Sequence, residues 1–210
     1  MNHPEIERRR TYTEDKVQAL RGRLGDADEL LGDDGCVYAT GSFGRLEAGE
    51  NSDLDLFIVG LNEQRQNPES KKLEATGESR VSNLNAICIK ADLIRSVSDL
   101  GLPKFDGDGK YLRHYSVHDL LNTLGKPEDD ASNTLTARLL LTLESRCLLG
   151  QMSYEKVLDE VIEKYWRDFE GHRDEFMPAF FANDILRLWR TFCINYEANT
   201  RDYPDDEKVK

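Results

Sequence analysis

The order of apolar and polar residues predicts strands and helices in the first half of the chain. Short apolar runs rich in β-branched residues predict strands over residues 36–40 and from about Ser52 onward, and residues 111–117 alternate as a half-buried strand does. Apolar residues at helical spacing predict a helix that begins at Thr13, the expected N-cap, and another over residues 82–100. The pattern therefore indicates a sheet that is packed against helices.

Three details of this first half follow from the local sequence. Residues 62–80 are polar and contain Pro68 and Gly77, which predicts a mobile polar loop or a weak helix. A short helix is expected to end before Gly32. The apolar face of the helix over residues 82–100 is expected to consist of Leu84, Ile87, Ala91 and Ile94.

The second half of the chain has a helical pattern. One helix is expected from residue 133 or 134 to about residue 149, a second over residues 157–169, and Pro178 suits the first turn of a third. The aromatic residues of these helices are expected to form the core of a bundle, with a base-stacking platform as the alternative: Trp166, Phe180, Phe181, Trp189 and Phe192. Arg138, Glu144 and Arg146 provide either a buried ion pair or a phosphate-facing arginine.

These patterns predict an α+β protein in three parts. A domain with a small mixed sheet is expected over residues 1–125, a helical domain over residues 133–200 and a polar tail over residues 201–210, with a linker at residues 126–130. The tail leaves open whether a longer protein continues beyond it. A length of 210 residues suffices for one large core or for two smaller units.

Charge and cysteine content narrow the possible partners. The 40 acidic and 28 basic residues give a net charge of −12, which disfavours adhesion to long nucleic acids or to anionic membranes. The four cysteines are widely separated and in apolar surroundings, as expected of reduced thiols, and no apolar run is long enough to span a membrane. We expect a cytoplasmic protein without a signal peptide.

A small-residue turn follows the first predicted strand. Gly41 lets the backbone approach a ligand closely, and a short helix is expected to begin there. The free N–H groups of that helix and the Ser42 hydroxyl suit a phosphate group. Arg45, one helical turn beyond Ser42, either adds positive charge to this site or forms a surface ion pair with Glu47 or Glu50.

Two carboxylates belong to the next predicted strand. Side chains alternate across a strand, so Asp53 and Asp55 are expected on one face, with Leu54 and Leu56 on the other. Such a pair suits Mg²⁺, which prefers carboxylate oxygens and keeps waters or phosphates as its other ligands. Two aspartates at a strand end are more often simply solvated, but their position after the phosphate-binding turn favours a functional pair.

The stretch from Gly41 to Leu56 resembles the signature of the nucleotidyltransferase superfamily typified by DNA polymerase β, in which a Gly-Ser or Gly-Gly turn precedes an Asp-x-Asp strand. Further runs are similar to the uridylyltransferases that modify the nitrogen-signalling protein PII: residues 114–117, 133–138 and 143–150. Those enzymes continue into a hydrolase domain and regulatory domains that have no counterpart here, so we expect a stand-alone nucleotidyltransferase rather than a PII regulator.

The resemblance implies transfer of a nucleoside monophosphate from a nucleoside triphosphate to a hydroxyl acceptor. Asp53 and Asp55 would bind Mg²⁺ or Mn²⁺, and Gly41, Ser42 and Arg45 would contact the nucleotide. The superfamily usually brings a third carboxylate from a later strand. The candidates for it are Asp108, which the PII-modifying enzymes favour by position, and Asp106; a hairpin turn over residues 106–109 is the alternative.

The resemblance leaves the acceptor open. A protein, an RNA end or a small molecule all remain, and no pattern in the sequence indicates base preference or oligomeric state. The alternative to an enzyme is a catalytically degenerate protein on the same scaffold, which binds nucleotide without releasing pyrophosphate.

Overall fold

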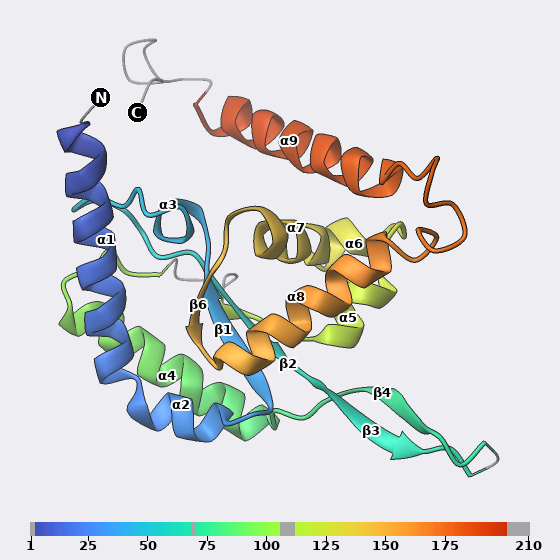
Figure 1. Cartoon of the computed structure of the whole chain (residues 1–210). Coiled ribbons are helices and arrows are strands. Elements are labelled where there is room, and N and C mark those ends of the chain that lie inside the picture. Colours follow the sequence, from blue (N-terminus) through green and yellow to red (C-terminus); the bar gives the residue numbers. More distant parts are fainter. Residues whose placement is uncertain (1–2, 69, 106–111, 201–210) are drawn as a thin grey trace. The chain divides into compact units, whose positions relative to one another are not determined.

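A computed structural model describes residues 3–68, 70–105 and 112–200 (Figure 1). The chain forms two compact units, Met1–Ile162 and Glu163–Lys210. Helices and a small mixed sheet make up the first unit and helices the second, which confirms the predicted α+β class.

A four-stranded sheet lies at the centre of the first unit, in the order β5-β2-β1-β6. Strand β1 (Gly35–Ala39) is antiparallel both to β2 (Leu56–Gly60) and to β6 (Arg146–Leu149), whereas β2 is parallel to β5 (His114–Ser116). All residues of β1 and β2 are buried. Both central strands are therefore covered on both faces, which explains their nearly continuous apolar sequences.

Three helices cover one face of this sheet: α1 (Pro4–Arg23), α2 (Gly25–Leu31) and α4 (Asn83–Asp99) (Figure 1). Their buried side chains pack on alternate strand residues, including Val37, Ala39, Leu56 and Ile58. Arg21 of α1 also donates hydrogen bonds to the carbonyl oxygens of the edge strand β6. Burial of this apolar surface is the main contribution to the stability of the unit.

Aromatic residues and a buried ion pair lie on the opposite face, with α5 (Val117–Asn122), α6 (Glu128–Ala131) and α7 (Thr134–Glu144). The rings of Tyr38 and Phe57 stack with centroids 5.5 Å apart, and the Tyr38 hydroxyl donates to the Ala137 carbonyl oxygen at 2.9 Å. Arg138 donates to both carboxylate oxygens of Asp129, at 3.0 and 2.8 Å, and both side chains are fully buried. Arg138 therefore belongs to a buried ion pair and does not face a phosphate.

The prediction of a loop or weak helix over residues 62–80 is wrong. Strands β3 (Asn62–Gln66) and β4 (Leu73–Ser79) pair there as an antiparallel hairpin, which extends away from the four-stranded sheet (Figure 1). Every described side chain of the hairpin strands is exposed or half-buried. Because neither face meets a core, the sequence has no apolar alternation that would have revealed the strands.

Two details of the predicted helices are also corrected. Helix α1 begins at Pro4, and Thr13 lies buried inside it, where its hydroxyl donates to the Arg9 carbonyl oxygen at 2.7 Å instead of capping the helix. Helix α4 has the predicted extent, and Ser82 caps it, but the expected apolar face is largely exposed, with Leu84 at 69% and Ile87 at 62%. The face that packs inward consists of Ala86, Ile89, Leu93, Ser96 and Val97.

The helix expected to run to residue 149 ends earlier. Helix α7 stops at Glu144, and residues 146–149 form β6. Gly150 has a positive φ of 70°, and a Cβ there would lie 2.2 Å from the Gly35 carbonyl oxygen, so the chain turns beside β1 as only glycine allows. Since β6 pairs with β1, the first compact unit extends past residue 125, and the expected linker forms the short helix α6.

Helix α8 (Gln151–Tyr165) leads from the first unit into the second, which contains α9 (Ala179–Thr200) directly after Pro178. Trp166 and Phe181 are half-buried, with their ring centroids 5.7 Å apart. Phe180, Trp189 and Phe192 of α9 are exposed, at 62%, 68% and 43%, and so do not form the bundle core predicted for them. None of the described helices has the length and apolar character that a membrane span requires.

Candidate active site

The predicted turn and one of the two predicted carboxylates, that of Asp55, meet in the structure. Helix α3 (Gly41–Gly44) begins directly after β1, and Gly41 has a positive φ of 60°. A Cβ atom on Gly41 would lie 3.0 Å from Oδ2 of Asp55. Glycine is therefore required at this position for two reasons: the backbone conformation and the close approach of the Asp55 carboxylate.

Asp53 and Asp55 lie in an extended segment that leads into β2. Leu54 and Leu56 are buried, at 3% and 0% exposure, while Asp53 is exposed and Asp55 is half-buried. This burial agrees with the predicted alternation, although the strand itself begins at Leu56 and not near Ser52. The carboxylates therefore belong to the side of the segment that faces away from the α1 and α4 core.

Backbone hydrogen bonds hold the segment beside the turn. The Thr40 N–H donates to the Asp55 carbonyl oxygen at 2.8 Å, and the Glu47 N–H donates to the Ser42 carbonyl oxygen, also at 2.8 Å. Gly44 packs so tightly against the end of α7 that a Cβ there would lie 1.8 Å from the Glu144 carbonyl oxygen. The end of β1, the turn and Asp55 thus form one rigid arrangement.

The guanidinium group of Arg45 is bound by two carboxylates. Its Nε donates to Glu47 at 2.8 Å and its Nη1 to Glu144 at 2.5 Å. These two hydrogen bonds raise the pKa of the guanidinium, although partial burial opposes them. The ion pair with Glu47 is the alternative that the sequence offered. A nucleotide phosphate would have to compete with two carboxylates for this side chain.

Two polar side chains near the turn have unusual surroundings that the sequence did not reveal. Thr40 is 1% exposed, and its hydroxyl is one of two fully buried side-chain groups that lack a hydrogen-bond partner among the described residues. The register of β1 and β2, continued by one residue, puts Thr40 opposite Asp55. The other group is Nε of Arg146, in the strand that pairs with Ala39. Only pairing between distant strands creates these surroundings.

The third carboxylate cannot be described in the same way. Asp106 and Asp108 both lie outside the described residues. Within the described part of the chain, no group of three or more His, Cys, Asp or Glu side chains could hold a metal ion. Of the predicted metal ligands, Asp53 and Asp55 lie within the described residues.

Comparison with known families identifies the part of the chain that contains this arrangement. Residues 20–121 match the family model of the nucleotidyltransferase domain. This part of the chain is therefore similar to that domain family. The matched residues include the Gly41 turn and both aspartates, which supports the superfamily resemblance, but the match does not single out the PII-modifying enzymes. No curated protein and no solved structure matches the chain significantly.

Proposed function

We propose that the protein transfers a nucleoside monophosphate from a nucleoside triphosphate to a hydroxyl group of an acceptor, with release of pyrophosphate. One observation carries this proposal: within the residues that match the nucleotidyltransferase domain, the Gly41 turn lies against the Asp55 carboxylate. A phosphate group held by the turn would therefore be next to Asp55, one of the proposed metal ligands.

The chemistry of the side chains fits a divalent cation. Asp53 and Asp55 offer carboxylate oxygens on the same side of the segment that leads into β2, and Mg²⁺ or Mn²⁺ would take its other ligands from water and phosphate. Such a cation would neutralise charge on the triphosphate and lower the pKa of the acceptor hydroxyl. Asp108, with Asp106 as the alternative, is proposed as the third carboxylate.

The chain's own residues have separate roles in this proposal. The N–H groups at Gly41 and Ser42 would bind the β- and γ-phosphates, and within the described residues the Ser42 hydroxyl makes no hydrogen bond that it would have to give up. The fixed position of Asp55 beside the turn would orient the triphosphate for attack in line with the leaving pyrophosphate. Arg45 would add positive charge only after leaving Glu47 or Glu144.

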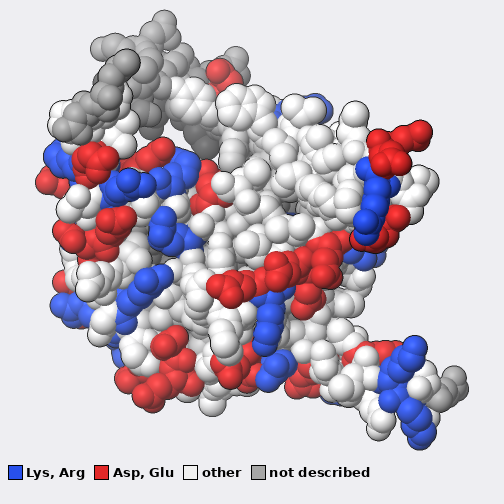
Figure 2. All heavy atoms as spheres, in the orientation of Figure 1, with Lys and Arg blue, Asp and Glu red and all other residues white. Residues whose placement is uncertain are grey.

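Surface charge supports a compact acceptor. The net charge is −12, and on the face shown in Figure 2 the Lys and Arg side chains are interspersed with Asp and Glu rather than joined into a basic surface. A small molecule, a protein or a short RNA end suits such a surface better than extended DNA does. We propose a cytoplasmic enzyme, similar to the PII-modifying enzymes in its transfer chemistry but with a different acceptor.

A second candidate function is nucleotide binding without transfer. The two ion pairs of Arg45 favour it, because they occupy the one arginine of the turn. A degenerate protein of this kind would bind a nucleoside triphosphate and would release no pyrophosphate.

A transfer assay tests both functions. The wild-type protein is incubated with each α-labelled nucleoside triphosphate, Mg²⁺ or Mn²⁺ and cell extract, and it is compared with Asp53→Asn/Asp55→Asn. The chain offers a matched control, Asp26→Asn/Asp28→Asn, which changes two exposed aspartates with the same spacing and the same change in charge.

We expect label to be transferred by the wild type and by the control variant, and transfer to be lost in Asp53→Asn/Asp55→Asn. Equal transfer by all three proteins would contradict the assigned site. Nucleotide binding without transfer by the wild type would favour the degenerate protein.

A further inference from the structure

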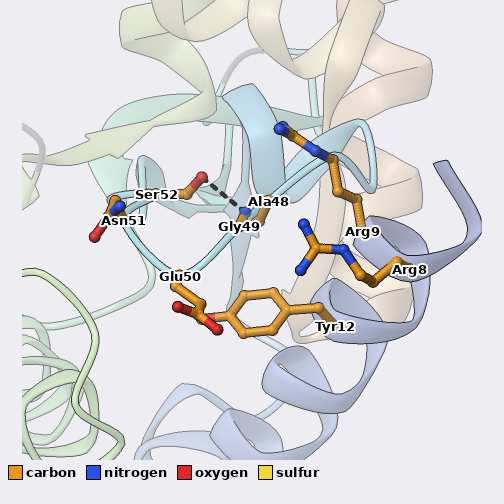
Figure 3. A pocket seen from close by; sticks show the side chains of 8 residues that line it. All are labelled: Arg8, Arg9, Tyr12, Ala48, Gly49, Glu50, Asn51 and Ser52. Atoms are coloured by element: carbon orange, nitrogen blue, oxygen red, sulfur yellow. Dashed lines mark hydrogen bonds between the residues drawn. The ribbon is translucent and has the colours of Figure 1, made fainter. Parts of the chain in front are cut away.

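A pocket of about 420 Å³ lies between α1 and the segment that leads to Asp53 (Figure 3). Helix α1 contributes three side chains to its wall and residues 48–52 contribute the rest. The lining residues are Arg8, Arg9, Tyr12, Ala48, Gly49, Glu50, Asn51 and Ser52. A volume of this size is typical of a site for a small molecule.

The wall formed by residues 48–52 is fixed by hydrogen bonds. The Ala48 N–H donates to the hydroxyl of buried Thr13 at 3.0 Å, which ties the segment to α1. The Gly49 N–H donates to the Ser52 hydroxyl at 2.9 Å, and the Ser52 N–H donates back to the Gly49 carbonyl oxygen at 3.1 Å. The chain's own hydrogen bonds therefore hold this wall of the pocket in place.

One side of the pocket is cationic, with Arg8 and Arg9 of α1. Arg8 and Arg9 share the single carboxylate of Glu5, with hydrogen bonds of 2.8 to 3.2 Å, and Arg9 also donates to the Glu47 carbonyl oxygen at 3.3 Å. The guanidinium group of Arg8 points from α1 toward the opposite wall (Figure 3). Each guanidinium has five N–H donors, so both arginines keep donors for an anionic ligand.

The other side of the pocket is aromatic and acidic. The ring of Tyr12 and the carboxylate of Glu50 lie next to each other (Figure 3), and burial, with a smaller effect of Glu50, raises the pKa of Tyr12. Among the described residues, Glu50 makes no hydrogen bond or ion pair, so its oxygens can accept from a ligand hydroxyl. The two sides thus suit different parts of one molecule: an anionic group and a hydroxyl-bearing part.

We propose that this pocket binds a small molecule that carries a phosphate or carboxylate group together with hydroxyls, and that this molecule is the acceptor. The second clause rests on the proposed transfer activity, while the binding itself does not. Ser52 lines the pocket and directly precedes the exposed Asp53, so the pocket opens beside the segment that bears both carboxylates. The Gly41 turn does not line the pocket, which leaves that turn to the nucleotide.

Titration with inorganic phosphate tests the binding. The amide NMR shifts of Gly49 and Ser52 are followed in the wild type, in Arg8→Gln and in the matched control Arg10→Gln, whose exposed arginine lies two residues away on α1 and does not line the pocket. We expect saturable shifts in the wild type and in the control, and binding about tenfold weaker in Arg8→Gln. Shifts that do not saturate, or equal affinity in both variants, would overturn the proposed site.

Transfer kinetics test the role of the ligand. With the small-molecule fraction of a cell extract as acceptor, Arg8→Gln is expected to need about tenfold more acceptor for half-maximal transfer, with an unchanged KM for the nucleoside triphosphate. Transfer by the wild type that Arg8→Gln leaves unaltered would reject the acceptor assignment and leave the proposed function standing. Transfer by the wild type with whole extract but not with its small-molecule fraction would also reject the acceptor assignment. Failure to transfer with whole extract would reject the proposed function, while the phosphate titration still decides whether the pocket binds anions.

Discussion

Residues 41–56 and residues 62–79 follow each other closely in the chain but are stabilised in opposite ways. The first segment contains the Gly41 turn and the aspartates, and it is anchored by the buried side chains of Phe43, Leu54 and Leu56. The second is the β3–β4 hairpin, which buries no described side chain. Packing thus holds the candidate site in one geometry, whereas ladder hydrogen bonds and exposed ion pairs hold the hairpin. Substitutions should therefore cost far more around the site than in the hairpin.

The largest expected contrast concerns the ion pairs of the two regions. Asp129→Ala in α6 removes a fully buried carboxylate to which the fully buried Arg138 cation donates two hydrogen bonds, so we expect a loss of about 3–5 kcal/mol in the free energy of unfolding. Glu78→Ala removes the hairpin partner of Arg65, where both side chains are well exposed, and should change stability by less than about 1 kcal/mol. Urea unfolding of both variants measures the difference, and similar losses would break the comparison.

Glycine substitutions give the next largest contrast. Gly44→Ala would bring Cβ against the Glu144 carbonyl oxygen, a backbone atom that cannot rotate away, so we expect a loss of about 3 kcal/mol and a displaced turn. In the hairpin, Gly77→Ala would bring Cβ only to 3.4 Å from the His118 ring and should change stability by less than about 1 kcal/mol. The midpoint of thermal unfolding reports both effects. A Gly44→Ala variant as stable as the wild type would show that the turn is not fixed by this contact.

Thr40→Val, next to the turn, is expected to stabilise the protein, unlike the substitutions above. The Thr40 hydroxyl is buried without a partner, and an unsatisfied buried hydroxyl is destabilising, so valine of nearly the same shape should raise the free energy of unfolding by about 1 kcal/mol. Thr40→Ser, which keeps the hydroxyl, is the control and should not stabilise the protein. Stabilisation by serine as well would show that the hydroxyl is not the cause.

The smallest expected effect lies where the hairpin meets the sheet. Nε2 of His114 in β5 lies 3.0 Å from the Ser79 hydroxyl of β4, and burial, with the nearby charge of Lys90, lowers the pKa of His114. A lowered pKa in the folded state means that the unfolded state binds the proton more readily. The contribution of neutral His114 to the free energy of unfolding should therefore be fully present above pH about 6.5. It should be lost as the pH falls from there through the lowered pKa.

His114→Gln isolates this contribution, because the variant lacks only the titrating imidazole. Unfolding in urea at several values between pH 8 and pH 5 should show a smaller loss of stability in the variant than in the wild type. If the free energy of unfolding has the same pH dependence in both proteins, His114 does not make the contact between the hairpin and the sheet pH-dependent.

The sequence predicted the Gly41 turn and the alternating burial of residues 53–56 because the relevant signals are local. Positive φ and close approach require glycine at position 41, and a period of two residues separates Asp53 and Asp55 from Leu54 and Leu56. The α+β class and the extent of α4 followed from the same kind of periodicity. The roles assigned to Asp53, Asp55 and Asp108 stay predictions.

What the sequence alone determined is therefore which segments form strands or helices around the turn, since backbone conformation and side-chain period are properties of neighbouring residues. Only the tertiary structure decided which face of α4 is buried, that residues 146–149 join the sheet, and that Thr40 lies opposite Asp55. These outcomes depend on residues that can lie a hundred or more positions apart, such as Gly44 and Glu144 or Val37 and Leu149. Burial is a property of the assembled fold, so a locally apolar face such as that of Leu84 and Ile87 remains exposed when another face packs better.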